Sequence, residues 1–402
     1  MTEAPATRWP FVVLATLAGA VAAMQIGKVP PAIPELRQEL ALGLVAAGWI
    51  ASIFNATSAA FGMGAGIVAD RLGHRHAVVA GLLALAAGGT LGAGSTTGAA
   101  LLGARFLEGI GFLVIAVASP SFIARVTDAR HLRLAIGLWA SYMPVGMAAM
   151  MLLSPLLLEA FGWRGLWYAN VLLALAVAAA FWTVSRGLVL PVPRRRSWAD
   201  VRASVGRAGP WLLAACFTCY TLQFFALMAW LPTFLVEDLG APLSTAAWMT
   251  ALVVAANMLG NWLGGWLLHR GVERWLVIAV VAATLGFLAV AVFSGPFPVL
   301  VKLGFAFLFS AIGGALPSAC LAGAPAHAAS PAQVGAVNGI IVQGANTGTL
   351  LGPPALAGAV TALGGWSEAS WLLLAPGAGG VTLALILRSV ERRPPEPARS
   401  AA

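Results

Sequence analysis

Two ionisable side chains, Arg105 and Glu108, lie within an otherwise apolar run of the sequence, from residue 98 to 123. If this run is helical, the two side chains lie one turn apart on the same face. Charged groups inside a membrane helix are costly, so they commonly mark the place where a solute or a proton binds. The pair therefore favours an anion at Arg105 and a proton at Glu108. Mutual pairing that only makes their burial tolerable is the alternative.

Two lysines have a weaker claim to such a role. Lys302 lies a short way into the apolar run 298–322, and Lys28 lies at the end of the run 9–27. The long lysine side chain can carry its ammonium group back to the membrane surface. Both lysines are therefore interpreted either as solute ligands or as interfacial anchors.

Soft side chains raise the question of a metal ion. Cys216 and Cys219 form a C-x-x-C pair, Cys320 lies in a later run, and Met143 and Met147 are four residues apart. Such ligands suit Cu(I). Cysteine and methionine are also ordinary packing residues, and all five histidines fall in predicted loops, which leaves no His and Met pair on one helix face. We expect no metal site and no cofactor, and keep soft-metal (copper) transport as an alternative function.

The sequence carries no pattern of an enzyme or of a sensor. A nucleophile needs a base beside it, and no histidine falls in a predicted apolar run. The phosphate-binding pattern G-x-x-x-x-G-K-[ST] is missing, and so is a long polar segment that could fold as a soluble domain. We therefore expect no catalytic residues, and expect an ion gradient or the gradient of a solute as the source of energy.

The composition indicates which solvent surrounds these residues. Of the 402 residues, 60% are hydrophobic and 9% are charged, and the mean hydropathy is +0.89. Soluble domains carry roughly a quarter of their residues as charges. The chain is therefore predicted to lie in a lipid bilayer, and its net charge of +9 indicates topology and anionic lipid rather than a nucleic-acid partner.

Apolar runs long enough to cross about 30 Å of hydrocarbon recur along the whole chain. Runs of this length without alternation exclude a β-barrel, so the predicted fold class is an all-α membrane protein. The twelve predicted spans are 9–27, 43–66, 77–95, 98–123, 134–158, 164–184, 210–235, 243–267, 275–293, 298–322, 333–358 and 366–388.

The basic residues predict the orientation of the spans. Of the 23 lysines and arginines, only Lys28, Arg37 and Arg164 fall in loops on the side opposite to the N-terminus. Arg105 and Lys302 fall within spans, and all the others lie on the side of the N-terminus. Cytoplasmic loops carry the excess of basic residues, so both termini are predicted to be cytoplasmic.

The longest internal polar stretch divides six spans from six. It runs from 185 to 209 and includes Pro191, Pro193 and three consecutive arginines. We interpret residues 1–184 as an N-terminal six-helix bundle, residues 185–209 as a cytoplasmic linker, and residues 210–402 as a C-terminal six-helix bundle with a short tail. GIVADRLGHRH, from Gly66, and GWLLHRGVER, from Gly265, follow the second and the eighth span, as expected of two repeated halves.

The first of these loops resembles the signature loop between helices 2 and 3 of the major facilitator superfamily, G-x-x-x-D-R-x-G-x-R. Its positions are occupied by Gly66, Asp70, Arg71, Gly73 and Arg75. The resemblance implies two pseudo-symmetric six-helix bundles that rock around a central site, with this loop as a conformational latch. The second copy departs from the pattern, because His269 stands where an aspartate would be, so one strong latch is expected.

Further motifs refine the resemblance. ARFLEGIGF, which contains Arg105, Glu108, Gly109 and Gly111, resembles the superfamily element R-x-x-Q/E-G-x-G. SYMPVG only partly resembles the element typical of drug/proton antiporters, which disfavours drug efflux. LQFFALMAWLPTFLVEDLG and VNGIIVQGANTGTLLGPP resemble the cyanate permease-like branch, whose members carry small anions or small polar organic molecules.

The resemblance implies a secondary active transporter of the bacterial cytoplasmic (inner) membrane that works by alternating access. Its expected partners are a small solute, protons and the lipid bilayer, with proton symport as the cycle and a monomer as the working unit. Drug or metabolite efflux remains an alternative function. Cavity-lining helices of the superfamily carry further candidate solute ligands here, which are Gln25, Tyr142, Tyr220, Gln223, Phe224, Trp230, Asn257, Asn261, Asn338, Gln343 and Asn346. Each of them is alternatively a hydrogen-bonding contact between helices.

Overall fold

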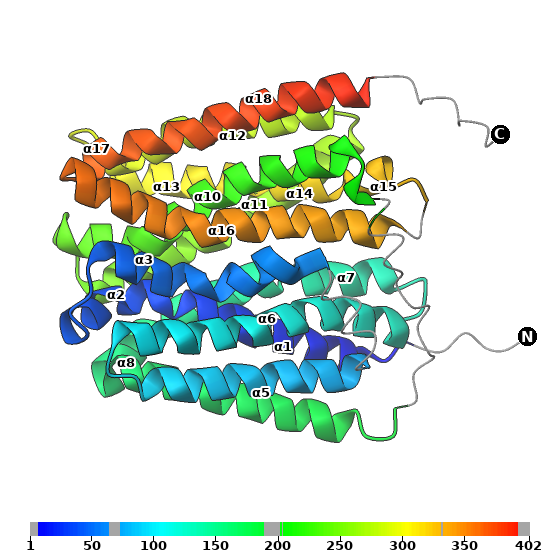
Figure 1. Cartoon of the computed structure of the whole chain (residues 1–402), viewed down its shortest axis with the longest axis horizontal. Coiled ribbons are helices and arrows are strands. Elements are labelled where there is room, and N and C mark those ends of the chain that lie inside the picture. Colours follow the sequence, from blue (N-terminus) through cyan, green and yellow to red (C-terminus); the bar gives the residue numbers. More distant parts are fainter. Residues whose placement is uncertain (1–6, 64–72, 189–201, 203, 331–332, 393–402) are drawn as a thin grey trace, which may run out of the picture.

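The computed structural model describes residues 7–63, 73–188, 202, 204–330 and 333–392, and this part of the chain is helical and contains no strand. Figure 1 shows long, roughly parallel helices, with α1 to α8 on one side and α10 to α18 on the other. The principal helices are α1 (Trp9–Gly27), α2 (Val29–Glu39), α3 (Leu44–Ser52), α5 (His74–Ala93), α6 (Gly98–Val126), α7 (Leu132–Ala140), α8 (Tyr142–Val184), α10 (Ala208–Glu237), α11 (Leu243–His269), α12 (Arg274–Phe293), α13 (Val299–Gly313), α14 (Ala315–Leu321), α15 (Ala324–His327), α16 (Val334–Leu363), α17 (Trp366–Ser370) and α18 (Leu374–Glu391).

The membrane-spanning helices follow the predicted order. Within the described residues, ten stretches are long and apolar enough to cross a bilayer. One of them, Leu134–Val184, contains two predicted spans, which are divided at Gly162, where the backbone has a φ of 63°. The polar helix α16 is not among the ten, although its 30 residues are long enough to span. Together these helices confirm the prediction of twelve spans in two six-helix bundles.

Several predicted boundaries need correction. The helix α1 ends at Gly27 as predicted, but a second helix, α2, follows Lys28, so that the helical stretch extends to Glu39. The predicted tenth span is divided into α13 and α14, and the short helix α15 follows it. The helix α10 begins at Ala208, two positions before the predicted start. Most of the predicted linker 185–209 lies outside the described residues.

The two ends of the bundle can be distinguished by the helices that lie there. We call the end with α2 and α17 the α2 end, and the end with α7 and α15 the α7 end (Figure 1). At the α7 end the Arg8 amide donates to Val126 O at 2.9 Å, and His327 contacts Glu391 at 3.1 Å. The first and last described helices, α1 and α18, therefore have their outer termini at the same end.

Small residues allow the helices to pack closely. On α16, Gly344, Gly348 and Gly352 form a stripe, and a Cβ atom added at any of them would collide with the backbone of α10. The hydroxyl of Thr221 crosses this contact and donates to Ala345 O at 2.7 Å. Close backbone approach through small residues is the usual way in which helices associate in lipid, where apolar burial provides no driving force between them.

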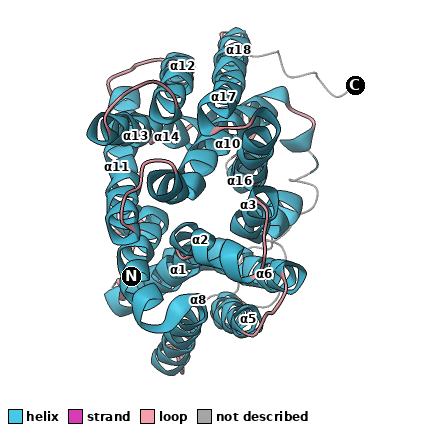
Figure 2. Cartoon of the chain, turned by 90° about the vertical axis from the view of Figure 1, so that its left-hand side faces the viewer, coloured by secondary structure: helices cyan, strands magenta, loops and turns pink. Residues whose placement is uncertain are grey.

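The two halves meet along three pairs of helices, which are α3 with α16, α8 with α11, and α2 with α10. A Cβ atom at Gly48 would lie 2.9 Å from the Cα atom of Pro354, and Trp248 Nε1 donates to Leu152 O at 3.2 Å. Figure 2 looks onto the α2 end, where α1, α2, α5, α6 and α8 gather below the helices of the second half.

Candidate functional site

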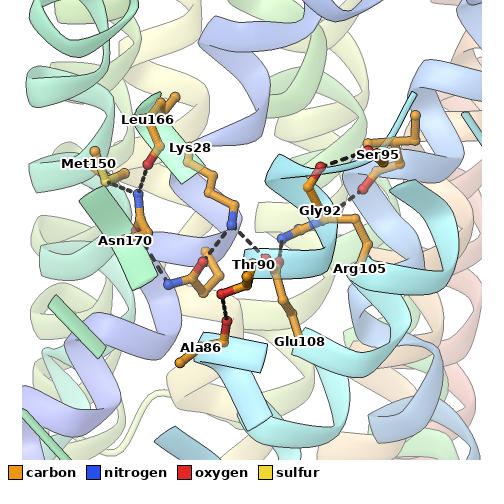
Figure 3. A network of polar contacts seen from close by, with 12 residues as sticks. Lys28, Ala86, Thr90, Gly92, Ser95, Arg105, Glu108, Met150, Leu166 and Asn170 are labelled. Atoms are coloured by element: carbon orange, nitrogen blue, oxygen red, sulfur yellow. Dashed lines mark hydrogen bonds and ion pairs between the residues drawn. The ribbon is translucent and has the colours of Figure 1, made fainter. Parts of the chain in front are cut away.

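Glu108 lies between two cations in the interior of the first half. Its Oε2 accepts a hydrogen bond from Arg105 Nη1, and its Oε1 lies 2.7 Å from Lys28 Nζ. Figure 3 shows the two cationic groups approaching the carboxylate from opposite sides. All three side chains have a solvent-exposed fraction of 0%. The predicted pairing of Arg105 with Glu108 is therefore present, and Lys28 joins it.

Of the two interpretations of Lys28, a solute ligand or an interfacial anchor, its position disfavours the anchor, because its ammonium group is fully buried on Glu108. Lys28 separates α1 from α2, and Pro30 and Pro31 follow it after Val29. Its side chain turns inward, so that Nζ lies 2.6 Å from Gln25 Oε1 and 4.4 Å from the ring centre of Trp167. The two polar contacts to oxygen and the aromatic face together make its burial possible.

Two amides complete the cluster. Gln25 Nε2 donates to Asn170 Oδ1 at 3.3 Å, and Asn170 Nδ2 donates to Leu166 O at 2.9 Å (Figure 3). The amides fix the Gln25 oxygen toward Lys28, since the nitrogen is engaged with Asn170 and with Val21 O. Gln25 was a predicted candidate, whereas Asn170 was missed because it is an ordinary single amide in an apolar run.

Glycines on α5 leave room for the carboxylate. A Cβ atom at Gly88 would lie 2.8 Å from Glu108 Cγ, and one at Gly89 would lie 3.5 Å from Glu108 Oε1. On the other side, Arg105 Nε donates to Ile50 O at 3.2 Å, and its guanidinium lies 4.7 Å from the ring centre of Phe54. Arg105 Nη2 is buried and has no hydrogen-bond partner among the described residues. The cluster thus contains an unused donor of a buried cation.

The charges of the cluster do not cancel. With Lys28 and Arg105 protonated and Glu108 ionised, the cluster carries one net positive charge in a fully buried setting. A buried charge is unfavourable unless it is paired and hydrogen-bonded. The arrangement can therefore bind one anion, or change its charge by taking up or releasing one proton.

The candidate solute ligands of the second half fall into two sets, of which the first lies between α10 and α11. Tyr220 and Asn257 are joined by a hydrogen bond of 2.8 Å from Asn257 Nδ2 to the phenol oxygen, and Phe224 stacks against Tyr220 with ring centres 5.6 Å apart. Asn261 Nδ2 donates to Asn257 Oδ1 at 3.1 Å. These four side chains form one polar and aromatic group that joins α10 to α11.

Two other candidates on α10 hold helices together. Gln223 Nε2 donates to Leu373 O at 2.6 Å, and Trp230 Nε1 donates to Pro353 O at 2.8 Å. Both side chains are buried. The contact of Gln223 favours the interhelical interpretation, because its amide nitrogen reaches the backbone between α17 and α18 rather than an open surface.

The remaining candidates lie apart from the charge cluster. Tyr142 stacks on Trp139 with ring centres 4.3 Å apart, near the start of α8. On α16, Gln343 Nε2 reaches Ala60 O at 3.5 Å, and Asn346 Nδ2 donates to Val342 O of its own helix at 2.8 Å. Asn338 Oδ1 and Gln343 Oε1 are buried without a hydrogen-bond partner among the described residues. Lys302, near the α2 end, donates to Ser294 O at 3.4 Å.

A narrow void between the two halves was not predicted from the sequence. It is apolar apart from one threonine, because its walls come from six helices whose facing side chains are mostly aliphatic or aromatic. The lining residues are Ile26, Pro30, Ala51, Met147, Phe225, Met228, Ala229, Thr349 and Pro353. Ile26 and Pro30 flank Lys28 in the chain, so the void and the charge cluster lie on either side of the same junction.

The predicted latch falls only partly within the described residues. Gly66, Asp70 and Arg71 lie outside them. Gly73 has a φ of 78°, a conformation that glycine adopts without strain, at the turn into α5. Arg75 Nε donates to the Ser185 hydroxyl at 2.9 Å, and Arg75 Nη2 donates to Trp182 O at 3.2 Å. Arg75 therefore binds α8 of its own half.

The three cysteines considered as ligands of a soft metal ion do not form a metal-binding group with other side chains of the described residues. Among the described residues, no cluster of three or more His, Cys, Asp or Glu has the geometry to hold a metal ion. Cys216 and Cys320 are buried, and Cys219 is partly buried. The five histidines lie at or near helix ends, and they are His74, His76, His131, His269 and His327.

Two bundles of membrane-spanning helices, with ionisable side chains buried inside one of them, define a multi-pass membrane transporter rather than an enzyme. The family is clear from the sequence comparison. The chain belongs to the Major Facilitator Superfamily, whose family model matches residues 15–342 and again 213–402.

Relatives within this family transport different solutes. A Bacillus subtilis protein assigned as a niacin/nicotinamide transporter, NiaP, is 24% identical over 277 residues, 66% of this chain and 67% of its own. The cyanate transport protein CynX of Escherichia coli is 25% identical over 315 residues, 76% of this chain and 78% of its own. The multidrug efflux pump LfrA of Mycolicibacterium smegmatis is 30% identical over 171 residues, 42% of this chain and 34% of its own.

Among solved structures, a bacterial homologue of the human lysosomal transporter Spinster, in an inward-facing and unoccupied conformation, has a similar fold. The TM-score is 0.77 over 96% of both chains, at 17% sequence identity. This likeness confirms the predicted fold.

Proposed function

We propose that this protein is a proton-coupled secondary transporter of a small anion or a small polar organic solute. The observation that carries the proposal is the buried cluster of Lys28, Arg105 and Glu108, with its one net positive charge and the unused Nη2 of Arg105. A monovalent anion that reaches Arg105 neutralises this charge. The relatives that are a cyanate transport protein and a niacin/nicotinamide transporter support a small solute.

Coupling to protons follows from competition for Arg105. When a solute anion binds the guanidinium, Glu108 loses one of its two counter-charges, and proton uptake restores the balance. Lys28 changes the sequence-based proposal, because Glu108 keeps this second cation as long as Lys28 stays in place. Glu108 therefore takes up a proton most readily when Lys28 withdraws as well.

The remaining candidates contribute to the solute path at the contact between the two halves. Tyr142 on α8 and Gln343 and Asn346 on α16 lie on helices of the two bundles that face each other. We assign to them the recognition of the polar part of the solute, and to the apolar void the recognition of its carbon skeleton. The group formed by Tyr220, Phe224, Asn257 and Asn261 stabilises the second bundle beside this path.

We assign the α7 end to the cytoplasm. Arg8, Arg75, Arg207 and Arg274 lie at this end, whereas the α2 end carries Arg37 and Arg164, each of them paired with a glutamate. This asymmetry supports cytoplasmic termini. The loop with Asp70 and Arg71 then lies on the cytoplasmic side, where we propose that it latches the two halves.

Uptake into proteoliposomes tests the proposal. The purified protein is reconstituted, and accumulation of radiolabelled cyanate and nicotinate is measured with and without an imposed pH gradient. We expect gradient-driven accumulation of one of these anions, and its loss in Arg105→Ala, which removes the anion-binding group. Anion uptake by Arg105→Ala equal to that of the wild type would contradict the proposal.

Efflux of drugs is a second candidate function. It is favoured by the apolar walls of the void, which include Met147, Met228 and Phe225, and by the partial match to the efflux pump LfrA. Flexible methionines suit varied hydrophobic ligands. Accumulation of a lipophilic cation such as ethidium in inverted membrane vesicles, together with no response to either anion, would favour efflux over anion symport.

A further inference from the structure

An exposed ion pair joins the two halves at the α2 end. Arg37 on α2 donates through Nη1 to Glu237 on α10, at 2.7 Å from Oε1 and 2.9 Å from Oε2. Side-chain exposure is 26% for Arg37 and 40% for Glu237, so the pair is in contact with the aqueous edge. Because α2 belongs to the first half and α10 to the second, this contact breaks when the halves separate at this end.

The other face of α2 is bound to its own half. Glu35 Oε1 accepts a hydrogen bond from the Trp163 amide at 3.0 Å, and Glu39 Oε2 accepts one from Trp163 Nε1 at 2.6 Å. Glu39 also pairs with Arg164. The helix α2 is thus held from both sides while the α2 end is closed, and from one side only after it opens.

The base of α2 is the junction that carries Lys28. Pro30 and Pro31 have no amide hydrogen, so the carbonyl groups of Ile26 and Gly27 lose their helical partners. A break in the hydrogen-bond ladder is where a helix bends most easily. The ammonium group of Lys28 extends from this break to Glu108.

We infer that Lys28 links closure of the α2 end to the protonation of Glu108, an inference that rests on the proposed proton coupling. With Arg37 bound to Glu237, α2 is restrained and Lys28 stays on Glu108, which remains ionised. When the ion pair breaks, α2 pivots on its contacts to α8, and Lys28 withdraws from the carboxylate. Glu108 then takes up a proton from the side that has just opened.

The surroundings of Glu108 leave few other groups that could control its protonation. Its own helix contributes Arg105, and the α1–α2 junction contributes Lys28. From α5, the uncharged Gly88 and Gly89 approach it. The nearby groups of α8 are the uncharged Trp167 and Asn170, and α3 contributes the carbonyl of Ile50 to Arg105. Within the described residues, Lys28 is therefore the charged group near Glu108 that is carried by the movable element.

Linkage makes the inference measurable. If opening and protonation are coupled, a lower pH must favour the open state, by up to about tenfold in the ratio of open to closed per pH unit for one proton. Spin labels on Gln38→Cys and Ser244→Cys, both exposed at the α2 end, report this ratio by pulsed electron paramagnetic resonance in nanodiscs. Cys216, Cys219 and Cys320 are first replaced by alanine.

The decisive variant is Lys28→Met, whose unbranched side chain is one atom shorter than that of lysine and carries no charge. We expect the open-to-closed ratio of Lys28→Met to change less than about twofold over the pH range in which the unsubstituted background responds fully. Lys28→Arg, as the matched control, should retain the response. A full response in Lys28→Met, or none in the background protein, overturns the inference.

A surface variant keeps the inference testable if Lys28→Met does not fold. Arg37→Gln weakens the exposed ion pair and should raise the open-to-closed ratio by roughly two- to fivefold, the usual worth of such a pair. The pH at which the open and closed states are equally populated should rise as well. Arg37→Lys should restore the original value of this pH. An unchanged pH of equal populations in Arg37→Gln contradicts the link.

Failure of the inference and of the proposed function give different results. If the protein accumulates an anion in response to a pH gradient while the distances in Lys28→Met still respond to pH, only the role of Lys28 is wrong. If the distances depend on Lys28 but no anion accumulates, the proposed solute class is wrong and the link stands.

Discussion

A buried carboxylate between two cations becomes more costly to keep ionised when either cation moves away from it. Glu108 meets Arg105 on its own helix and Lys28 from the α1–α2 junction, and no water-exposed surface is available to any of the three. Removing one partner of such a group leaves an uncompensated buried charge, which is strongly unfavourable. Exchange of a proton or an anion is therefore the least costly way for this cluster to change.

Glu108→Gln tests the role of the carboxylate. The amide has nearly the same size, cannot ionise, and imitates the protonated form, so we expect anion binding to survive and accumulation driven by a pH gradient to be lost. Binding is measured as a thermal shift with the anion alone, and accumulation is measured in proteoliposomes. A ligand at about 100 times its dissociation constant should stabilise the variant by roughly 2.7 kcal/mol.

The control for this variant is another carboxylate of the same half. Glu159 on α8 is exposed, so Glu159→Gln removes one negative charge without touching the cluster and should transport like the wild type. Accumulation at the wild-type rate in Glu108→Gln would leave the cluster as a structural brace.

Short-range pairing within the site could be predicted from the sequence, because residues three apart on a helix face the same way. Arg105 and Glu108 are such a pair. The inward course of Lys28 could not be predicted, since it depends on the distant side chains of Glu108 and Trp167. The interhelical role of Gln223 likewise depends on a carbonyl 150 positions away.

At the scale of the elements, the contact between α10 and α16 depends on glycines, which have no side chain to separate the two helices. Gly344, Gly348 and Gly352 bring the helix backbones close enough for Thr218 to donate to Gly344 O at 2.8 Å. Such a contact is held by dispersion and by hydrogen bonds rather than by apolar burial. Any added volume separates the helices and weakens both.

Gly348→Ala should therefore destabilise the protein. The new methyl group would meet the Thr218 carbonyl and the Thr221 hydroxyl at a distance that real atoms do not adopt, and overpacking of this kind costs about 1–3 kcal/mol. The measurement is the melting temperature in detergent, which should fall. Gly358→Ala on the same helix is the matched control, because its Cβ atom meets nothing within 4 Å, and a melting temperature equally lowered in both variants would rule out the packing argument.

The twelve helices follow from the apolar runs, because a backbone in lipid has to satisfy its hydrogen bonds within each helix. Their ends are less predictable. The sequence of α2 is polar and contains three prolines, which is typical of a loop. It is nevertheless helical, and Glu35, Arg37 and Glu39 form hydrogen bonds to α8 and α10. The polar α16 is a helix for a related reason, since its small residues pack against α10.

For the whole molecule, the contacts between the halves are unequal at the two ends. At the α2 end, Arg37 and Glu237 join α2 to α10. At the α7 end, the network of Arg207, Arg274, His327 and Glu391 lies within the second half. Arg75 at the same end contacts α8 within the first half. The described ion pair between the halves thus lies at the α2 end, and alternating access requires it to exchange for other contacts at the α7 end.

The orientation of the molecule in the membrane gives the last prediction. Ser244 in the first turn of α11 lies at the α2 end and Ser389 near the end of α18 lies at the α7 end, and both are exposed. In a variant whose three native cysteines are replaced, we expect Ser389→Cys to react with a membrane-impermeant maleimide only after the membrane is opened. Ser244→Cys should react in intact cells, because the excess of basic residues at the α7 end predicts that this end is cytoplasmic. Labelling of both positions in intact cells would contradict the twelve-span arrangement, and the reverse pattern would invert the molecule, so that Lys28 and the Arg37–Glu237 pair would control access from the cytoplasm.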